Sequence, residues 1–141
     1  MKNYYLKPVV NSDIKFLYDL LKERDPSANI SHKKIPIYAQ HKKFVMSKPY
    51  SKWYIIEYNR KKIGSIYLSK QNEIGIFLKK EFHALGLAYE ALKLIMKKNP
   101  RKRFLANVSP KNKKSMKFFK QNNFQLIQYT YEYEPRKNKT K

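Results

Sequence analysis

The three glycines of the chain lie within one short span, at positions 64, 75 and 86. Gly86 directly precedes an amphipathic segment, and the first N–H groups of a helix, together with the helix dipole, form a site suited to phosphate. Gly86 would let a ligand approach that backbone, and Gly75, inside a strand-like segment, would mark a bulge or a second close approach. Together they indicate an extended, phosphate-bearing ligand. A simple turn at Gly86 and room for a neighbouring side chain at Gly75 are equally compatible with the pattern.

The elements that would hold these glycines can be read from the hydrophobic periodicity. Helical spacing predicts helices over 11–26, where Pro26 ends the first, and over 36–46, with Pro36 near the first turn. Short segments rich in β-branched and aromatic residues then predict three antiparallel strands joined by tight turns, at 53–58, 62–68 and 73–78. The stripe that begins at Ala88 predicts a third helix, which Asn99 and Pro100 end.

Two further strands and one more helix are expected in the C-terminal part. Strands are predicted at 103–108 and 124–133, with a helix over 109–123 that Ser109 caps and Pro110 opens. The order of elements indicates the α/β (α+β) class, with helices packed against a mixed sheet. We expect one domain, 1–134, followed by a basic, disordered tail, 135–141.

The composition limits the class of protein and its partners. Lys and Arg number 32 against 10 Asp and Glu, a formal charge of +22, which would attract polyanions such as nucleic acid, acidic lipid or phosphorylated small molecules. The chain has no cysteine, so thiol catalysis, disulfides and cysteine metal sites are excluded. Neither an apolar signal core nor a run of membrane-spanning length is present, and the expectation is a cytoplasmic protein without a metal or a membrane partner.

Two motifs carry a resemblance to a known family. The run "HALGLA" at 83–88 follows the strand 73–78, and "NKKSMKFFKQNNF" at 112–124 follows the strand 103–108. With the order of elements, they resemble the GNAT superfamily of acyl-CoA-dependent N-acetyltransferases over nearly the whole chain. The resemblance implies a mostly antiparallel central sheet with helices on both faces, and acetyl-CoA as co-substrate.

The resemblance also implies where acetyl-CoA would bind. The pantetheine would lie against the main chain of 76–78, in the splay between that strand and 103–108, and the pyrophosphate would lie in the 83–88 turn. His83 departs from the Gln or Arg that is usual in this turn. The implied cofactor-binding residues are Ile76, Phe77, Leu78, His83, Ala84, Leu85, Gly86, Leu87, Ala88, Asn112, Ser115 and Phe119.

Acetyl transfer to an amine needs a neutral amine and a polarised thioester carbonyl. Deprotonating an alkyl ammonium at pH 7 costs about 4 kcal/mol, so a general base is useful. Glu73, at the start of the glycine-bearing strand, is the carboxylate best placed by sequence, and Glu57 is the second; each is equally compatible with a solvated charge at a strand end. A backbone N–H near Phe77 would polarise the carbonyl.

Phe119 occupies the position of the family's usual tyrosine general acid, and Asn107 stands where some relatives carry a catalytic glutamate. The alternatives are that Ser115, Tyr129, Tyr131 or water supplies the proton, that the thiolate leaves unassisted, or that the protein binds acyl-CoA without catalysis. The length of the acyl group stays open.

The acceptor is expected near the second helix. His41 and Phe44 fall at i and i+3, with Trp53 soon after. The segment resembles the His-x-x-aromatic element of GNAT enzymes that acetylate amino groups on nucleotide-linked sugars, which implies a substrate-binding set of His41, Phe44, Trp53 and Glu57. A core or interface position for these residues is an equal alternative.

Other functions also fit parts of the pattern. The basic clusters and twelve tyrosines would suit a nucleic-acid-binding protein, but the lysines are spread over every element and no RNA-binding signature is present. Protein N-termini or lysines stay open as acceptors, and the enzyme would be a monomer or a homodimer.

Overall fold

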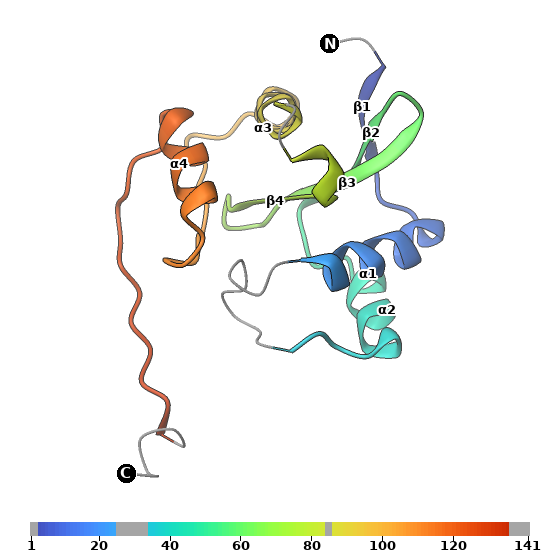
Figure 1. Ribbon diagram of the computed structural model, residues 1–141, viewed down its shortest axis with the longest axis horizontal. Coiled ribbons are helices and arrows are strands. Elements are labelled where there is room, and N and C mark those ends of the chain that lie inside the picture. Colours follow the sequence, from blue (N-terminus) through green and yellow to red (C-terminus); the bar gives the residue numbers. More distant parts are fainter. Residues whose placement is uncertain (1–2, 25–33, 84–85, 136–141) are drawn as a thin grey trace.

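The computed structural model describes residues 3–24, 34–83 and 86–135, and Figure 1 shows the arrangement of its elements. Two short 3-10 turns, η1 (Asn11–Asp13) and η3 (Lys80–Phe82), precede α1 and follow β4. The helices and strands in chain order are β1 (Tyr4–Pro8), α1 (Ile14–Glu23), α2 (Tyr38–Met46), β2 (Lys52–Tyr58), β3 (Lys61–Leu68), β4 (Ile74–Leu78), α3 (Leu87–Lys98) and α4 (Lys113–Gln121).

The four strands form one antiparallel sheet in the order β1-β2-β3-β4. The expected three-strand meander of β2, β3 and β4 is therefore confirmed. The only parallel pairing in the described part of the chain is an isolated bridge between Glu73 and Leu105. β4 is thus the last strand of the sheet, and most of its outer edge has no strand beside it.

Helix α3 covers one face of this sheet and supplies the larger core. Ile63, Ile66 and Leu68 of β3 pack with Leu92 and Ile95 of α3, and none of the five side chains is more than 1% exposed. Truncating a side chain of this kind to alanine typically costs about 2–5 kcal/mol. This core sets the position of α3, and therefore of its N-terminus, relative to the end of β4.

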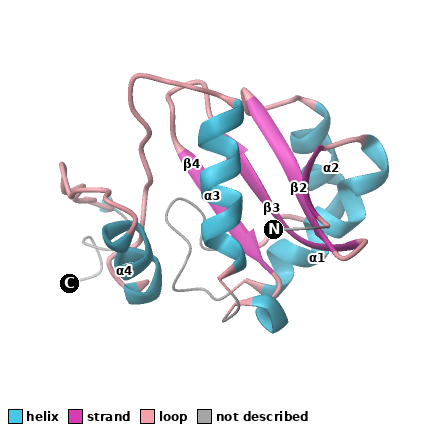
Figure 2. Ribbon diagram, turned by 90° about the horizontal axis from the view of Figure 1, so that it is seen from above, coloured by secondary structure: helices cyan, strands magenta, loops and turns pink. Residues whose placement is uncertain are grey.

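Helices α1 and α2 cover the opposite face, as Figure 2 shows. Ile14 and Leu17 of α1, Val45 of α2 and Ile55 of β2 form a second buried cluster. The expectation of helices on both faces of the sheet is confirmed. The two N-terminal helices therefore lie on the face of β4 that α3 does not cover.

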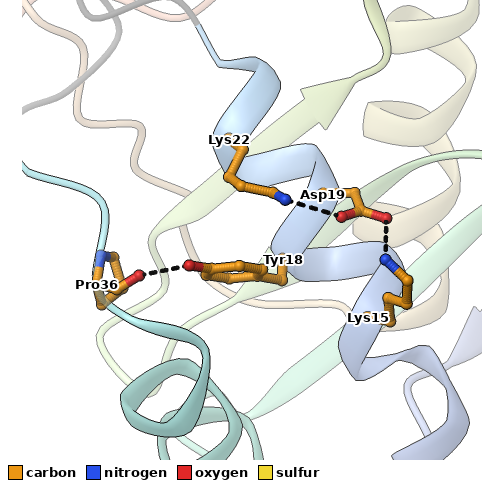
Figure 3. A network of polar contacts seen from close by, with 5 residues as sticks. All are labelled: Lys15, Tyr18, Asp19, Lys22 and Pro36. Atoms are coloured by element: carbon orange, nitrogen blue, oxygen red, sulfur yellow. Dashed lines mark hydrogen bonds and ion pairs between the residues drawn. The ribbon is translucent and has the colours of Figure 1, made fainter.

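Polar contacts join α1 to the segment that leads into α2 (Figure 3). The Tyr18 hydroxyl donates a hydrogen bond to the Pro36 carbonyl at 2.9 Å. The next residue of α1, Asp19, forms ion pairs with Lys15 at 3.2 Å and Lys22 at 3.4 Å, and the hydrogen bond from Lys15 lowers the pKa of Asp19. The Tyr18 hydrogen bond thus connects α1 to the residues before α2, whereas the exposed ion pairs add little stability.

The first strand, β1, was not expected from the sequence. It is short and contains Lys7 and Pro8, but Tyr4 and Leu6 are buried while Tyr5 and Lys7 are exposed. This period-two alternation was the available signal. The buried Tyr4 hydroxyl donates a hydrogen bond to the Leu87 carbonyl at 2.6 Å, so β1 also anchors the start of α3.

The C-terminal part corrects three expectations. Residues 103–108 form no strand beyond the single bridge at Leu105, and residues 124–133 form no strand. Helix α4 begins at Lys113, not near Pro110, because Ser109 and Asn112 close a turn first, with Asn112 N–H donating to the Ser109 carbonyl at 2.9 Å. Strand propensity was present in both segments, but neither has a partner strand.

The described residues contain no helix that is both long and apolar enough to span a bilayer. Residues 136–141 of the expected basic tail lie outside the described residues. The single-domain organisation over 1–134 stays a prediction.

Candidate active site

The outer edge of β4 is closed at one end and open at the other. At the closed end, Ile74 N–H donates to the Leu105 carbonyl at 2.7 Å, and Leu105 N–H donates to the Asn72 carbonyl at 2.8 Å. Successive residues of a strand direct their N–H groups to opposite sides. The N–H groups of Ile76 and Leu78, on either side of Phe77, therefore point to the open edge, where an extended ligand would find hydrogen-bond partners.

The open edge leads to the N-terminus of α3. Gly86 caps this helix with φ 71° and ψ 9°, a left-handed conformation that favours glycine. A Cβ at Gly86 would have no other atom within 4 Å, so the surrounding space is open. Leu87 is only 1% exposed, so it offers a ligand its backbone and not its side chain. Ala84 and Leu85, expected in the same turn, lie outside the described residues.

His83 stands between the strand edge and the helix start. Its Nε2 is 2.8 Å from the Leu78 carbonyl, a hydrogen bond in which the ring nitrogen donates. The side chain is therefore directed back to the end of β4. The contact links the last residue of the open edge to the turn that precedes α3.

Glu73 lies where the open edge begins. One carboxylate oxygen accepts a hydrogen bond from the Ser69 hydroxyl at 3.1 Å, and the other accepts one from the Asn107 side-chain amide at 2.5 Å. The sequence had suggested Glu73 and Asn107 separately, and the structure brings them together. Asn107 thus holds the carboxylate of Glu73 in place.

Five aromatic side chains gather on the face of the sheet that carries α1 and α2. The rings of Tyr50 and Tyr67 are stacked, with centroids 3.8 Å apart and an interplanar angle of 5°. The ring centroids of Tyr67 and Phe77 are 6.3 Å apart, and Trp53 packs edge-on to Tyr50 with the centroids 4.8 Å apart. The ring centroids of Phe44 and Trp53 are 6.2 Å apart. We call Phe44, Tyr50, Trp53, Tyr67 and Phe77 the aromatic cluster.

Arg24, which follows α1, adds a positive charge to the aromatic cluster. Its guanidinium carbon is 4.2 Å from the centroid of the Phe77 ring, a cation–π geometry. Burial lowers the pKa of Arg24 but leaves an arginine charged at neutral pH. Burial also raises the pKa values of Tyr50 and Tyr67, so both phenols stay protonated.

Sequence reasoning had found Phe44, Trp53 and Phe77 but missed Tyr50, Tyr67 and Arg24. The available signal for Tyr67 was its alternation with Ile66 and Leu68 on β3, which directs it to the opposite face of the sheet from that core. No local signal marked Tyr50 or Arg24, which lie outside regular elements.

His41 and Glu57 do not join this site. His41 is 6% exposed, its ring centroid is 5.2 Å from that of Tyr18, and burial lowers its pKa. Glu57 forms an ion pair with Lys7 at 3.0 Å. In the strand register Glu57 lies opposite Lys62 of β3, whereas Ile74, the residue after Glu73, lies opposite Leu68, six residues further along the same strand. That separation corresponds to about 20 Å. His41 is therefore a core residue, and Glu57 lies near the other end of the sheet from Glu73.

The expected residues of α4 contact neighbouring residues of the segment 112–124, and Phe119 also packs against the larger core. Asn112 caps the helix, because its side-chain oxygen accepts a hydrogen bond from Ser115 N–H at 3.2 Å. Phe119 packs edge-on against Phe118 and Phe124, each at 5.1 Å. These contacts stabilise the start and the end of α4, which gives a structural reason for the motif at 112–124.

No cluster of three or more His, Cys, Asp or Glu side chains that could hold a metal ion occurs among residues 3–24, 34–83 and 86–135. The residues brought together form an open strand edge, a helix start and a carboxylate beside aromatic rings. These parts suit an extended phosphate-bearing ligand and a proton transfer.

The chain belongs to the GNAT acetyltransferase family, because the acetyltransferase (GNAT) domain profile matches residues 4–125. It is accordingly an acyl-CoA-dependent N-acetyltransferase, and enzymes of this family use acetyl-CoA. No curated protein sequence matches the chain.

Several solved structures share the fold. A domain from Methanocaldococcus jannaschii has a TM-score of 0.79 at 20% identity, covering 92% of both chains. RimL, a ribosomal-protein alpha-N-protein acetyltransferase in complex with coenzyme A, has a TM-score of 0.73 at 18% identity, covering 91% of this chain and 83% of its own. A chimera of the spermidine N-acetyltransferase SpeG from Vibrio cholerae and hSSAT has a TM-score of 0.67 at 13% identity, covering 85% of this chain and 79% of its own. At these identities the likeness concerns the fold alone.

Proposed function

We propose that the protein transfers an acetyl group from acetyl-CoA to a primary amine that is held against the aromatic cluster. The pantetheine arm lies along the open edge of β4, where it bonds to the backbone of Ile76 and Leu78. The pyrophosphate lies at the start of α3, around Gly86 to Ala88. The observation that carries this proposal is the single closure of the β4 edge at Leu105, which leaves an open strand edge running from Glu73 to the helix start.

Glu73 acts as the general base in this proposal. The amine nitrogen attacks the thioester carbonyl, the C–N bond forms, the C–S bond breaks, and the nitrogen's proton passes to Glu73, directly or through water. The backbone N–H of Ile76 or Leu78 polarises the carbonyl oxygen. The departing thiolate, with a pKa of about 8.5 for a simple thiol, takes its proton from solvent. A general acid is therefore not essential, and Phe119 is compatible with turnover.

We further propose that the acceptor carries a negative charge near its amine, and that a nucleotide-linked amino sugar fits best. The stacked Tyr50 and Tyr67 rings offer a surface for a base, and the Arg24 guanidinium offers a partner for a diphosphate. A formal charge of +22 favours an anionic substrate and opposes a polycation such as spermidine. An amino sugar is also less basic than a lysine side chain, which lowers the cost of deprotonation.

A second acceptor class is the N-terminal amine of an acidic peptide; RimL, which shares the fold, is an alpha-N-protein acetyltransferase. An α-amine has a pKa of about 7.7–8.0, so its deprotonation at pH 7 costs only about 1 kcal/mol. The same positive charge would attract an acidic peptide. The two classes differ in whether base stacking contributes to binding.

The first test is calorimetric titration with acetyl-CoA at moderate salt, with dephospho-CoA and inorganic polyphosphate as charge controls. Saturable one-site binding that exceeds both controls supports the acetyl-CoA site. Binding no stronger than that of polyphosphate, and lost with added salt, rejects it.

The second test measures CoA release with a thiol reagent, to which the chain contributes no background because it has no cysteine. The acceptors are a uridine-diphosphate-linked amino sugar, the same free amino sugar, an acidic peptide with a free N-terminus, and spermidine. The proposal requires the nucleotide-linked sugar to give the highest kcat/KM. Preference for the peptide supports the second class, and preference for spermidine rejects the anionic acceptor.

A further inference from the structure

The segment 124–133 follows α4 and lies outside the four-stranded sheet. Its first residue, Phe124, donates its N–H to the Phe119 carbonyl at 3.0 Å. Within the part of the chain that the structure describes, residues 125–131 make no backbone hydrogen bond with any other segment. Figure 1 shows the segment leaving α4 and running away from the sheet. Residues 125–131 have strand propensity, and their backbone groups can therefore pair with a strand on either edge.

One face of this segment is apolar and exposed. Ile127, Tyr129, Tyr131 and Tyr133 alternate with polar residues, so in an extended chain they lie on one face. Their exposed fractions range from 68% to 91%. A protein rarely leaves so many large apolar side chains in a row in water unless they form an interface, and an open strand edge is a template for pairing with another chain.

The segment 103–108 presents a matching edge. Leu105 directs its N–H and C=O groups to Asn72 and Ile74. The neighbouring Phe104 and Ala106 therefore direct theirs to the opposite side. Among the described residues, the backbone groups of Phe104 and Ala106 have no hydrogen-bond partner.

The charges of the two segments are complementary. Residues 121–135 contain no Lys or Arg and carry Glu132 and Glu134, in a chain whose formal charge is +22. The 103–108 segment, in contrast, is flanked by the basic runs 97–103 and 111–114. Two copies of so basic a chain repel each other almost everywhere, so the stretch without basic residues is where a second copy can approach.

We propose that residues 124–133 of one copy pair as a strand with residues 103–108 of a second copy, and reciprocally, which gives a twofold dimer. The pairing satisfies one open edge of each segment, covers the apolar face and brings the two glutamates towards the basic runs. Pairing of 124–133 with its own copy in the partner would instead bring two acidic segments together. Within one chain, α4 joins the two segments, and no backbone hydrogen bond connects them. This proposal does not depend on the acceptor or on the acetyl-CoA site.

Sedimentation velocity of the full chain tests the dimer. We expect a species of twice the 17.0 kDa chain mass at micromolar concentration. The double variant Ile127→Asp/Tyr131→Asp, which places charge on the apolar face, should sediment as a monomer. The matched control Gln128→Asp/Thr130→Asp adds the same charge to the opposite face and should stay largely dimeric. A wild-type chain that is monomeric at every concentration overturns the proposal, as does equal dissociation of both variants.

Cross-linking tests which segments pair. Since the chain has no cysteine, Ala106→Cys and Thr130→Cys can be introduced in separate preparations, mixed and treated with a short bis-maleimide. The expected product is a covalent dimer of the two different chains. A chain that carries both substitutions should cross-link mainly to other chains. Exclusively intramolecular products, or no product from a mixture that sediments as a dimer, contradict the pairing.

Discussion

The ring of Tyr67 on β3 occupies the space that a side chain at position 75 of β4 would need. The two residues are opposite each other in the strand register, and a Cβ at Gly75 would overlap the Tyr67 ring. Gly75 therefore makes room for a neighbouring side chain and not for a ligand, which corrects the interpretation based on the glycine spacing. The consequence is a tyrosine that lies flat across β4, stacked on Tyr50, one strand position from Ile74 and the closed end of the β4 edge.

Replacing Gly75 with Ala should force the Tyr67 ring out of this position. We expect the KM for the acceptor to rise about tenfold, equivalent to about 1.4 kcal/mol, with the acetyl-CoA affinity nearly unchanged. Steady-state kinetics and calorimetry measure the two effects. In the background of Tyr67→Ala, the same substitution should have little further effect, because the clash is already removed. An equal loss in both backgrounds would assign the effect to the strand backbone.

Replacing Gly86 should weaken acetyl-CoA binding for two separable reasons. Ala at this position strains the left-handed backbone, whereas Asn tolerates that conformation but adds a side chain to the open space. We expect at least a tenfold rise in Kd for Gly86→Val, about 1.4 kcal/mol, and a measurable rise for Gly86→Asn. Calorimetry gives the Kd values. If all three variants bind acetyl-CoA like the wild type, the phosphate does not lie at the start of α3.

Glu73→Gln should lower kcat by about 10²-fold or more, the range for loss of a general base, while leaving the acetyl-CoA Kd unchanged. Glu57→Gln is the matched control, because it removes the same charge near the opposite end of the sheet and should leave kcat unaltered. Thiol release under saturating substrates provides the measurement. An unaltered rate in Glu73→Gln would remove Glu73 as the base.

His41 should make stability depend on pH. Its pKa in the folded protein lies below the ordinary value of about 6.5 because burial disfavours the charged form. The unfolded chain then binds the proton more readily, so stability is present above pH 6.5 and is lost as the pH falls through the depressed folded pKa. Thermal unfolding across this range should show a steeper loss for the wild type than for His41→Phe. An identical pH dependence of thermal unfolding in the two proteins would show that protonation of His41 does not affect stability.

Much of the fold follows from local periodicity. The strands β2, β3 and β4 and the helices α1, α2 and α3 each bury one face, and the matching two-residue or 3.6-residue spacing is visible in the sequence. β1 carries only a weak signal in the sequence, because Tyr4 and Leu6 are the only residues that show its alternation. The segments 103–108 and 124–133 have the propensity of strands, but a strand forms only when a partner strand completes its hydrogen bonds.

The sequence by itself determined the family, the core-facing residues of the central elements, the glycine before α3 and the carboxylate of Glu73. It did so because these features depend on residues close together in the chain. Only the tertiary structure decided that Asn107 holds Glu73, that Tyr67 fills the space over Gly75, that Arg24 lies on Phe77 and that His41 is buried against α1. Each of these contacts joins residues that are distant in sequence, and their meeting depends on how the sheet and the two helices on its other face pack.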